Sequence, residues 1–211
     1  MFHRLLPVFA LAGATAAHAA TVEIAVVDQH GKPAANAVAT LVPDAGAPAS
    51  HVQARTVIDQ QHETFLPLVV VVRKGGEVVF TNNDTTMHQV YSFSPVRQFQ
   101  FEIDRGQVSK PVVFDKPGVA AIGCNIHDSM VAYVFVADQP FAAVSDASGH
   151  VEFRDVPDGA WRVGLWHPAL KPGHPQAPIA LAVAGNAKLT LTAPLGNTGM
   201  PAMSRMHKSD Y

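Results

Sequence analysis

Short runs of Val, Ile, Phe and Thr alternate with clusters of Gly, Pro, Asn and Asp along most of the chain. Runs of about five to eight residues with this composition are typical of β-strands separated by turns. Almost no segment shows the spacing of an amphipathic helix. The pattern therefore predicts an all-β fold, either a sandwich or a barrel. The predicted strands are residues 22–28, 36–43, 66–72, 77–82, 110–115, 119–124, 131–138, 141–146, 150–156, 160–167, 179–185 and 187–193.

Two turns in the middle of the chain predict local strand pairs. The turn RKGG joins 66–72 to 77–82, and the turn KPG joins 110–115 to 119–124. Gly and Pro in such clusters mark turns, so each pair is expected to be hairpin-like. Residues 91–110 are expected to be an excursion that connects neighbouring strands.

The first residues of the chain have the features of an export signal. His3 and Arg4 give a basic start, an apolar run covers 5–17, and Ala17-His18-Ala19 fits the small-x-small pattern before a cleavage site. The run is shorter than the roughly 20 residues that span a bilayer. We therefore expect cleavage of residues 1–19 and a periplasmic mature protein. The alternative is an uncleaved N-terminal anchor. No later segment is long and apolar enough to span a membrane.

Composition narrows the classes of function. Hydrophobic residues make up 48% of the chain and charged residues 15%, which suits a packed core rather than disorder. The net charge of -2 gives no attraction to nucleic acid or to an anionic membrane. An exported chain with a single Cys forms no internal disulfide. Cys124 is therefore a buried structural residue, an intermolecular bridge or a metal ligand.

The surroundings of that cysteine favour a metal ligand. Cys124 ends a predicted strand, His127 lies on the loop beyond it, and Met130 opens the next strand. His88 lies 36 residues before the cysteine, on a predicted turn after a strand (124 − 88 = 36). Two imidazoles, one thiolate and a weak methionine sulfur form a blue-copper electron-transfer site. Zinc fits less well, because structural zinc sites do not use a thioether.

Each of these residues also has an ordinary structural role when it is taken alone. Cys124 and Met130 can fill a core, and His88 can be a hydrogen-bonded core or surface histidine. Their order and spacing together favour copper. Gln89, which follows the first histidine, is either a hydrogen-bonding partner of the site or a solvated edge residue; the sequence leaves this open.

Two segments resemble the ligand regions of cupredoxins. VRKGGEVVFTNNDTTMHQV (72–90) is similar to the first, and FDKPGVAAIGCNIHDSM (114–130) to the second, with an amicyanin-like C-x-x-H-x-x-M loop. The resemblance implies a Greek-key sandwich over 55–138. It also implies one type 1 copper held by His88, Cys124, His127 and Met130. The wider chain resembles cupredoxin-type methylamine utilization proteins.

The flanking segments resemble another module. VEIAVVDQHGKPAANAVATLVPD (22–44) and VSDASGHVEFRDVPDGAWRVGLWHP (144–168) are similar to the two halves of a carboxypeptidase regulatory-like, transthyretin-like sandwich. We therefore expect one discontinuous domain, 20–50 plus 139–195, interrupted by the cupredoxin, and a loose tail at 196–211. The alternative is a single larger sandwich. Residues that should share the core of the discontinuous domain are Val26, Ala37, Val151, Phe153, Trp161, Val163 and Leu165.

The resemblance implies a periplasmic electron carrier that is not an enzyme. Electrons would pass through His127, with Ile126 and Met130 in an apolar patch, to a redox partner such as a c-type cytochrome or a dehydrogenase. The alternative is a copper-binding or copper-delivery protein. The H-x-H and H-C-H pairs of copper enzymes do not occur. Trp166 and His167 either pack the two domains together or face a partner, and we expect the former. The tail residues Met200, Met203, Met206 and His207 are either a Cu(I) site or part of a loose terminus, and we expect the latter.

Overall fold

The computed structural model describes residues 19–45, 55–170 and 176–196. These residues form strands and no helix, so the predicted all-β class is confirmed. Consequently, the described part of the chain has no helix that could cross a membrane. Most of the predicted signal sequence and the residues Met200, Met203, Met206 and His207 of the predicted tail lie outside the described residues.

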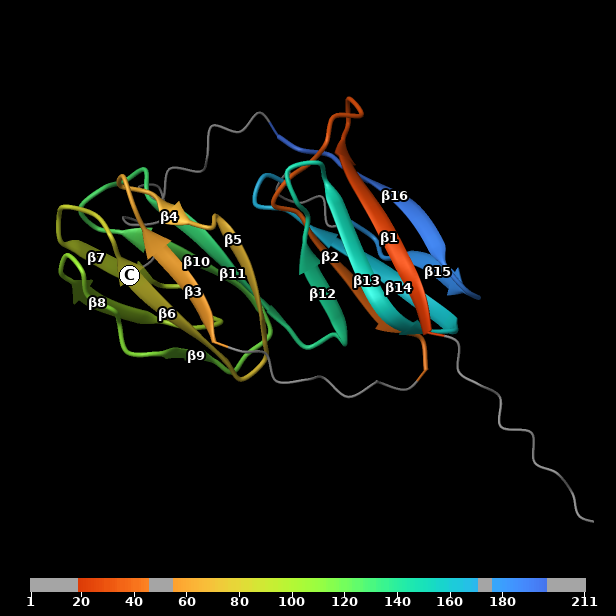
Figure 1. The fold of residues 1–211 in the computed structure, drawn as a ribbon, viewed down its shortest axis with the longest axis horizontal. Helices are drawn as coiled ribbons and strands as arrows, with labels where there is room; N and C mark the ends of the chain where they lie inside the picture. The colour runs from red at the N-terminus through yellow and green to blue at the C-terminus, as the bar shows by residue number, and fades with distance from the viewer. Residues whose placement is uncertain (1–18, 46–54, 171–175, 197–211) are drawn as a thin grey trace, which may run out of the picture.

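Strands β3 to β11 form what we call the central sandwich (residues 56–137; Figure 1, orange to green). One sheet has the order β5-β11-β10-β7-β8 and the other β4-β3-β6-β9. The strands are β3 (Thr56–Gln60), β4 (Phe65–Leu66), β5 (Val69–Arg73), β6 (Gly76–Asn82), β7 (His88–Ser92), β8 (Phe99–Ile103), β9 (Val112–Phe114), β10 (Gly118–Cys124) and β11 (Val131–Ala137).

The strands before and after this block form the flanking sandwich (Figure 1, red with teal and blue). Its sheets have the orders β13-β1-β16 and β12-β2-β14-β15. The strands are β1 (Ala19–Asp28), β2 (Val38–Pro43), β12 (Phe141–Val144), β13 (His150–Pro157), β14 (Gly159–Trp166), β15 (Ile179–Val183) and β16 (Ala187–Ala193).

Strands from the two ends of the chain share one sheet. Within β1, Ile24 pairs with Val151 of β13 on one side and with Leu189 of β16 on the other. Val26, Ala37, Val151, Phe153, Trp161 and Val163 are buried in one cluster, and Leu165 packs against it, as the sequence predicts. This cluster is separate from the core of the central sandwich. The division of the chain into one domain of 20–50 plus 139–195 and another of 55–138 stays a prediction.

The two predicted hairpins are wrong. β5 and β6 belong to opposite sheets, because β5 pairs in parallel with β11 while β6 pairs with β3 and β9. β9 and β10 are likewise in opposite sheets. In both places the turn carries the chain across the core rather than back along its own sheet. An alternating or apolar run shows that a strand is buried but does not identify its partner.

The burial of β5 explains its uninterrupted apolar sequence. Val70 and Val72 face the core of the central sandwich, whereas Val69 and Val71 belong to the cluster between the sandwiches. A strand covered on both faces has no polar side, so its sequence loses the period of two.

The predicted excursion over 91–110 contains a strand that sequence reasoning missed. β8 pairs with β7 and forms the edge of the five-stranded sheet. Phe99 and Phe101 face inward against Phe80, so the alternation Phe-Gln-Phe-Glu-Ile was a usable signal. The short strands β3 and β4 were also not predicted.

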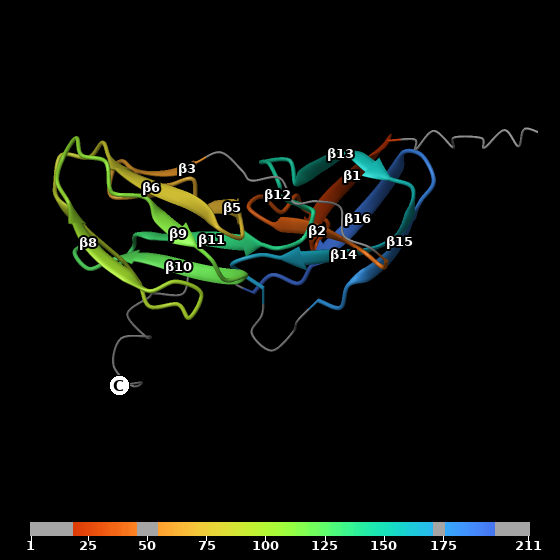
Figure 2. The same ribbon diagram turned by 90° about the horizontal axis from the view of Figure 1, so that it is seen from below.

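A third apolar cluster joins the two sandwiches, which lie end to end in Figure 2. Trp166 of β14 packs edge-on against Tyr133 at 5.6 Å between ring centres, and its ring centre lies 5.9 Å from that of Phe135. The predicted packing role of Trp166 is therefore confirmed. His167 instead makes a hydrogen bond within the flanking sandwich: its Nε2 lies 3.0 Å from the Ala35 carbonyl oxygen.

The linker between β11 and β12 is held by a side chain of the central sandwich. The Arg73 guanidinium, at the end of β5, donates to the backbone carbonyl of Gln139 and, at 2.7 Å, to that of Pro140. The Lys74 N–H donates to the Ala137 carbonyl at 2.9 Å. These bonds fix the direction in which the chain leaves the central sandwich.

Candidate metal centre

The loop between β6 and β7 positions His88. Asn82 ends β6 fully buried, and its Nδ2 donates to the carbonyls of Thr86 (2.9 Å) and Ile103 (3.0 Å). Its Oδ1 accepts from the Asp84 N–H at 2.9 Å. Through Asn82, these bonds connect the loop to the end of β6 and to Ile103 at the end of β8. His88 is the first residue of β7, not part of a turn as predicted, and it is fully buried.

Cys124 is the last residue of β10 and lies beside Val90 of β7. The segment after it is tied to β7 by two bonds: the Asn125 N–H donates to the Gln89 carbonyl at 3.0 Å, and the Asn125 Nδ2 donates to the Gln89 Oε1 at 2.7 Å. Gln89 therefore supports the loop that carries His127. This answers the question that the sequence left open.

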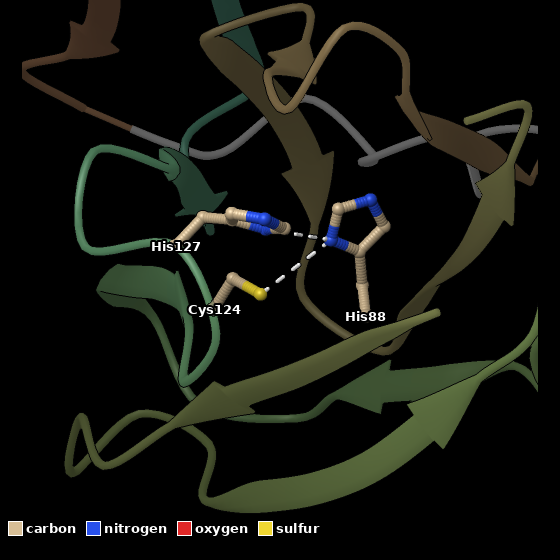
Figure 3. Close-up of side chains that lie close together, drawn as sticks. All are labelled: His88, Cys124 and His127. Atoms are coloured by element: carbon tan, nitrogen blue, oxygen red, sulfur yellow. Dashed lines mark hydrogen bonds between the residues drawn. The ribbon is translucent and has the colours of Figure 1, made fainter. Parts of the chain in front are cut away.

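The three predicted donors converge at one point (Figure 3). The Cys124 Sγ lies 3.6 Å from the His88 Nδ1, and the His127 Nδ1 lies 3.3 Å from the same nitrogen. All three ligand atoms lie within 4.8 Å of one another. Cys124 is 3% exposed, whereas the His127 side chain is 20% exposed. The group thus lies just under the surface and reaches it through His127.

Met130, the fourth predicted ligand, is the last residue before β11 and is buried. It is 1% exposed and belongs to the same core cluster as Cys124. Its N–H donates to the His127 carbonyl at 3.0 Å, which closes the loop between β10 and β11. The prediction that Met130 belongs to a surface patch is wrong, because its side chain points into the core. Ile126 is 48% exposed and does lie at the surface.

The outer nitrogen of His88 has an acidic partner. The His88 Nε2 lies 3.1 Å from the Asp84 Oδ2, and Asp84 is only 8% exposed. The Glu63 backbone N–H donates to the same oxygen, and this bond is the largest cause of the lowered pKa of Asp84; the His88 ring contributes as well. An ionised carboxylate accepts the Nε2 proton, so His88 keeps its Nδ1 lone pair for a metal.

The outer nitrogen of His127 also faces a carboxylate. The His127 Nε2 lies 3.5 Å from the Glu63 Oε1. Sequence reasoning missed both Glu63 and Asp84. Asp84 had a usable signal, since it lies four residues before His88 in a polar loop. Glu63 had none, because it lies 64 residues before His127 (127 − 63 = 64).

The donor set fits a copper ion. Two donors bound at trigonal angles, each at about 2.0–2.3 Å from a first-row metal, lie about 3.5–3.8 Å apart. The separations of 3.3 and 3.6 Å are within a few tenths of an ångström of these values. Two imidazoles and a thiolate suit copper better than calcium, and a structural zinc site would use more Cys or Cys/His pairs. Among the described residues, no other group of three His, Cys, Asp or Glu side chains offers such a cluster.

Neither a family model nor a curated protein sequence matches the chain. The solved structures that resemble part of it include a purple cupredoxin from Nitrosopumilus maritimus, with a TM-score of 0.36 and 22% identity over 39% of this chain and 99% of the other. Amicyanin from Paracoccus versutus gives 0.36 and 21% over 46% and 91%. A copper-containing nitrite reductase from Thermus scotoductus gives 0.38 and 20% over 46% and 25%. Relationships to the carboxypeptidase regulatory-like module and to methylamine utilization proteins stay predictions.

Proposed function

We propose that this chain is a mononuclear type 1 copper protein that carries electrons between redox partners in the periplasm. His88, Cys124 and His127 would bind the ion, with Met130 as a weak axial ligand. The observation that carries the proposal is the convergence of two imidazole Nδ1 atoms and one thiol sulfur within 4.8 Å. Copper held by such ligands supplies a one-electron Cu(II)/Cu(I) couple.

The surrounding residues favour electron transfer over catalysis. His88, Cys124 and Met130 are nearly inaccessible to water, and strand pairing or loop hydrogen bonds hold each of them. Ligands held in this way would move little between Cu(II) and Cu(I), so little energy would be lost in reorganisation. Four side-chain ligands also leave no open position for a substrate, which catalytic metal sites require. We therefore assign no enzymatic step to the chain.

His127 provides the route to a partner. Of the three donors, His88 and Cys124 are buried and only His127 is partly exposed. The neighbouring Ile126 is 48% exposed. A partner that docks here would come within reach of the imidazole. The partner class that fits is a c-type cytochrome or a dehydrogenase. Export after cleavage behind Ala19 would bring the chain to the periplasm.

Cyclic voltammetry and electron self-exchange of the copper-loaded protein test the proposal. We expect a reversible one-electron couple and rapid exchange between Cu(I) and Cu(II) forms. A bound copper that shows no reversible couple, but passes readily to a chelator, would support copper delivery instead. Cell fractionation with N-terminal mass analysis tests the location; a cytoplasmic chain that retains residues 1–19 would contradict it.

A further inference from the structure

The turn between β3 and β4 has an unusual backbone conformation. Gln61 and Thr64 exchange backbone hydrogen bonds of 3.0 and 3.1 Å, which leaves His62 and Glu63 as the two central residues. Both have positive φ, 52° and 54°. This is the type I′ geometry, for which Asn-Gly is preferred because side chains with a Cβ are strained there. His62 and Glu63 both carry a Cβ, so both are strained in this conformation.

The same turn is linked to both site histidines, to His127 directly and to His88 through Asp84. The Glu63 N–H donates to the Asp84 Oδ2 at 2.6 Å, and that oxygen lies 3.1 Å from the His88 Nε2. The Glu63 carboxylate lies 3.5 Å from the His127 Nε2. The backbone of one residue thus acts on the first imidazole through Asp84, and its side chain acts on the second.

Strained backbone in a folded protein is retained where the surrounding structure makes use of it. We propose that the His62–Glu63 turn is a clamp for the two imidazoles, with Glu63 as a positioning residue for His127. Resting on the proposed copper function, this assigns to Glu63 a role outside the ligand set. The carboxylate, 3.5 Å from the His127 Nε2, favours the proton on that nitrogen and so leaves the Nδ1 directed at the His88 Nδ1, 3.3 Å away.

The clamp makes a prediction for the apo protein that does not depend on copper. In neutral imidazole, the proton of His127 should reside on Nε2, because the negative charge of Glu63 lies on that side of the ring. Glu63→Gln should give a mixture of tautomers, visible in the ring ¹³C and ¹⁵N shifts. The control is Glu152→Gln on β13 of the flanking sandwich, which removes the same charge and should leave His127 unchanged. Equal His127 tautomers in both variants would overturn the clamp.

Copper binding gives a second readout. Loss of an outer partner of a ligating histidine costs about tenfold in metal affinity. The negative charge of Glu63 favours Cu(II) over Cu(I). Glu63→Gln should therefore weaken Cu(II) binding about tenfold, and if Cu(I) binding is unchanged the reduction potential rises by about 59 mV. The shift should shrink in high salt, since the Glu63 side chain is 57% exposed. A potential identical to that of Glu152→Gln would contradict the proposal.

The variant Glu63→Gly separates the backbone strain at this position from the positioning of His127 by the Glu63 side chain. Glycine accepts a positive φ without cost, so this variant should unfold at a higher denaturant concentration than the wild type, yet bind copper about tenfold more weakly. If the denaturant midpoint and the copper affinity of Glu63→Gly both rose or both fell, the clamp would be overturned. A wild-type chain that bound no copper would overturn the proposed function, and the apo tautomer measurement would still decide the clamp.

Discussion

Replacing Trp166 by alanine should weaken the contact that joins the two sandwiches. The indole lies between strands of both, with ring centres 5.6 Å from Tyr133 and 5.9 Å from Phe135. It also packs against the buried Val38, Val69 and Val131. The Trp166 ring contacts two aromatic rings of the central sandwich, so this substitution removes an aromatic link between the two sandwiches.

The expected cost follows from burial and from the ring contacts. Removing a fully buried Trp side chain costs about 3–5 kcal/mol. Trp166 is only partly buried, so we take about 2 kcal/mol for its packing. The two aromatic contacts add about 0.5 kcal/mol each, which gives a total of about 3 kcal/mol. Trp166→Phe keeps one ring in the cluster and should cost about 1 kcal/mol.

Urea denaturation, followed separately in each sandwich, tests this value. The chain has two Trp residues, so in Trp166→Ala the fluorescence of Trp161 reports on the flanking sandwich alone. Hydrogen exchange in β10 reports on the central sandwich. We expect coincident transitions in the wild type and separated ones in the variant. The control is Ile179→Ala on β15, whose side chain is 44% exposed and which should cost less than about 1 kcal/mol. If both variants lost the same stability and kept coincident transitions, the interface would not couple the sandwiches.

Three further substitutions have defined outcomes. Gly149 has φ of 77° and a Cβ there would lie 2.3 Å from the Val26 carbonyl oxygen, so Gly149→Ala should lower the unfolding free energy by about 2–3 kcal/mol; an unchanged urea midpoint would refute this. The Ser148 hydroxyl, with the His150 N–H, lowers the pKa of Asp146. The unfolded carboxyl therefore takes up its proton first as the pH falls, so the stability that Asp146 contributes at neutral pH is lost as the pH falls below about 4. Melting curves of Asp146→Asn should show a shallower acid limb than the wild type, and an identical limb would exclude Asp146 as a source. Met130→Gln should retain copper and lower the reduction potential; complete loss of the metal in dialysis would show that Met130 is a primary ligand.

The sequence predicted most of the strands and the donor group because both have local signals. Cys124, His127 and Met130 lie within one short loop, and His88 follows a buried strand, so their order alone indicates a shared site. The packing of Trp166 was also predictable, because a large aromatic side chain at the end of a strand seeks an apolar partner. The burial of Met130 was not: a residue at a strand start can face either way, and only the register of β11 decides it.

Strand partners and distant contacts were not predictable in this way. The residues of β5 and β6 are close in sequence but pair in different sheets, because a sandwich connects consecutive strands across its core. The contact between Glu63 and His127 depends on a His-Glu pair in a turn that usually has Asn-Gly. Nothing in the local sequence indicates that conformation. It becomes evident only when the loop after β10 and the turn after β3 are seen side by side.

The visible absorption and electron paramagnetic resonance spectra of the copper-loaded wild type and of Cys124→Ser test the central claim most directly. A thiolate bound to Cu(II) gives an intense visible charge-transfer band, and a trigonal site gives a narrow copper hyperfine splitting. We predict both for the wild type and loss of the band in Cys124→Ser, whose far-ultraviolet circular dichroism should stay unchanged. A wild-type protein that binds copper without the band, or a Cys124→Ser variant that keeps it, would show that Cys124 is not a copper ligand.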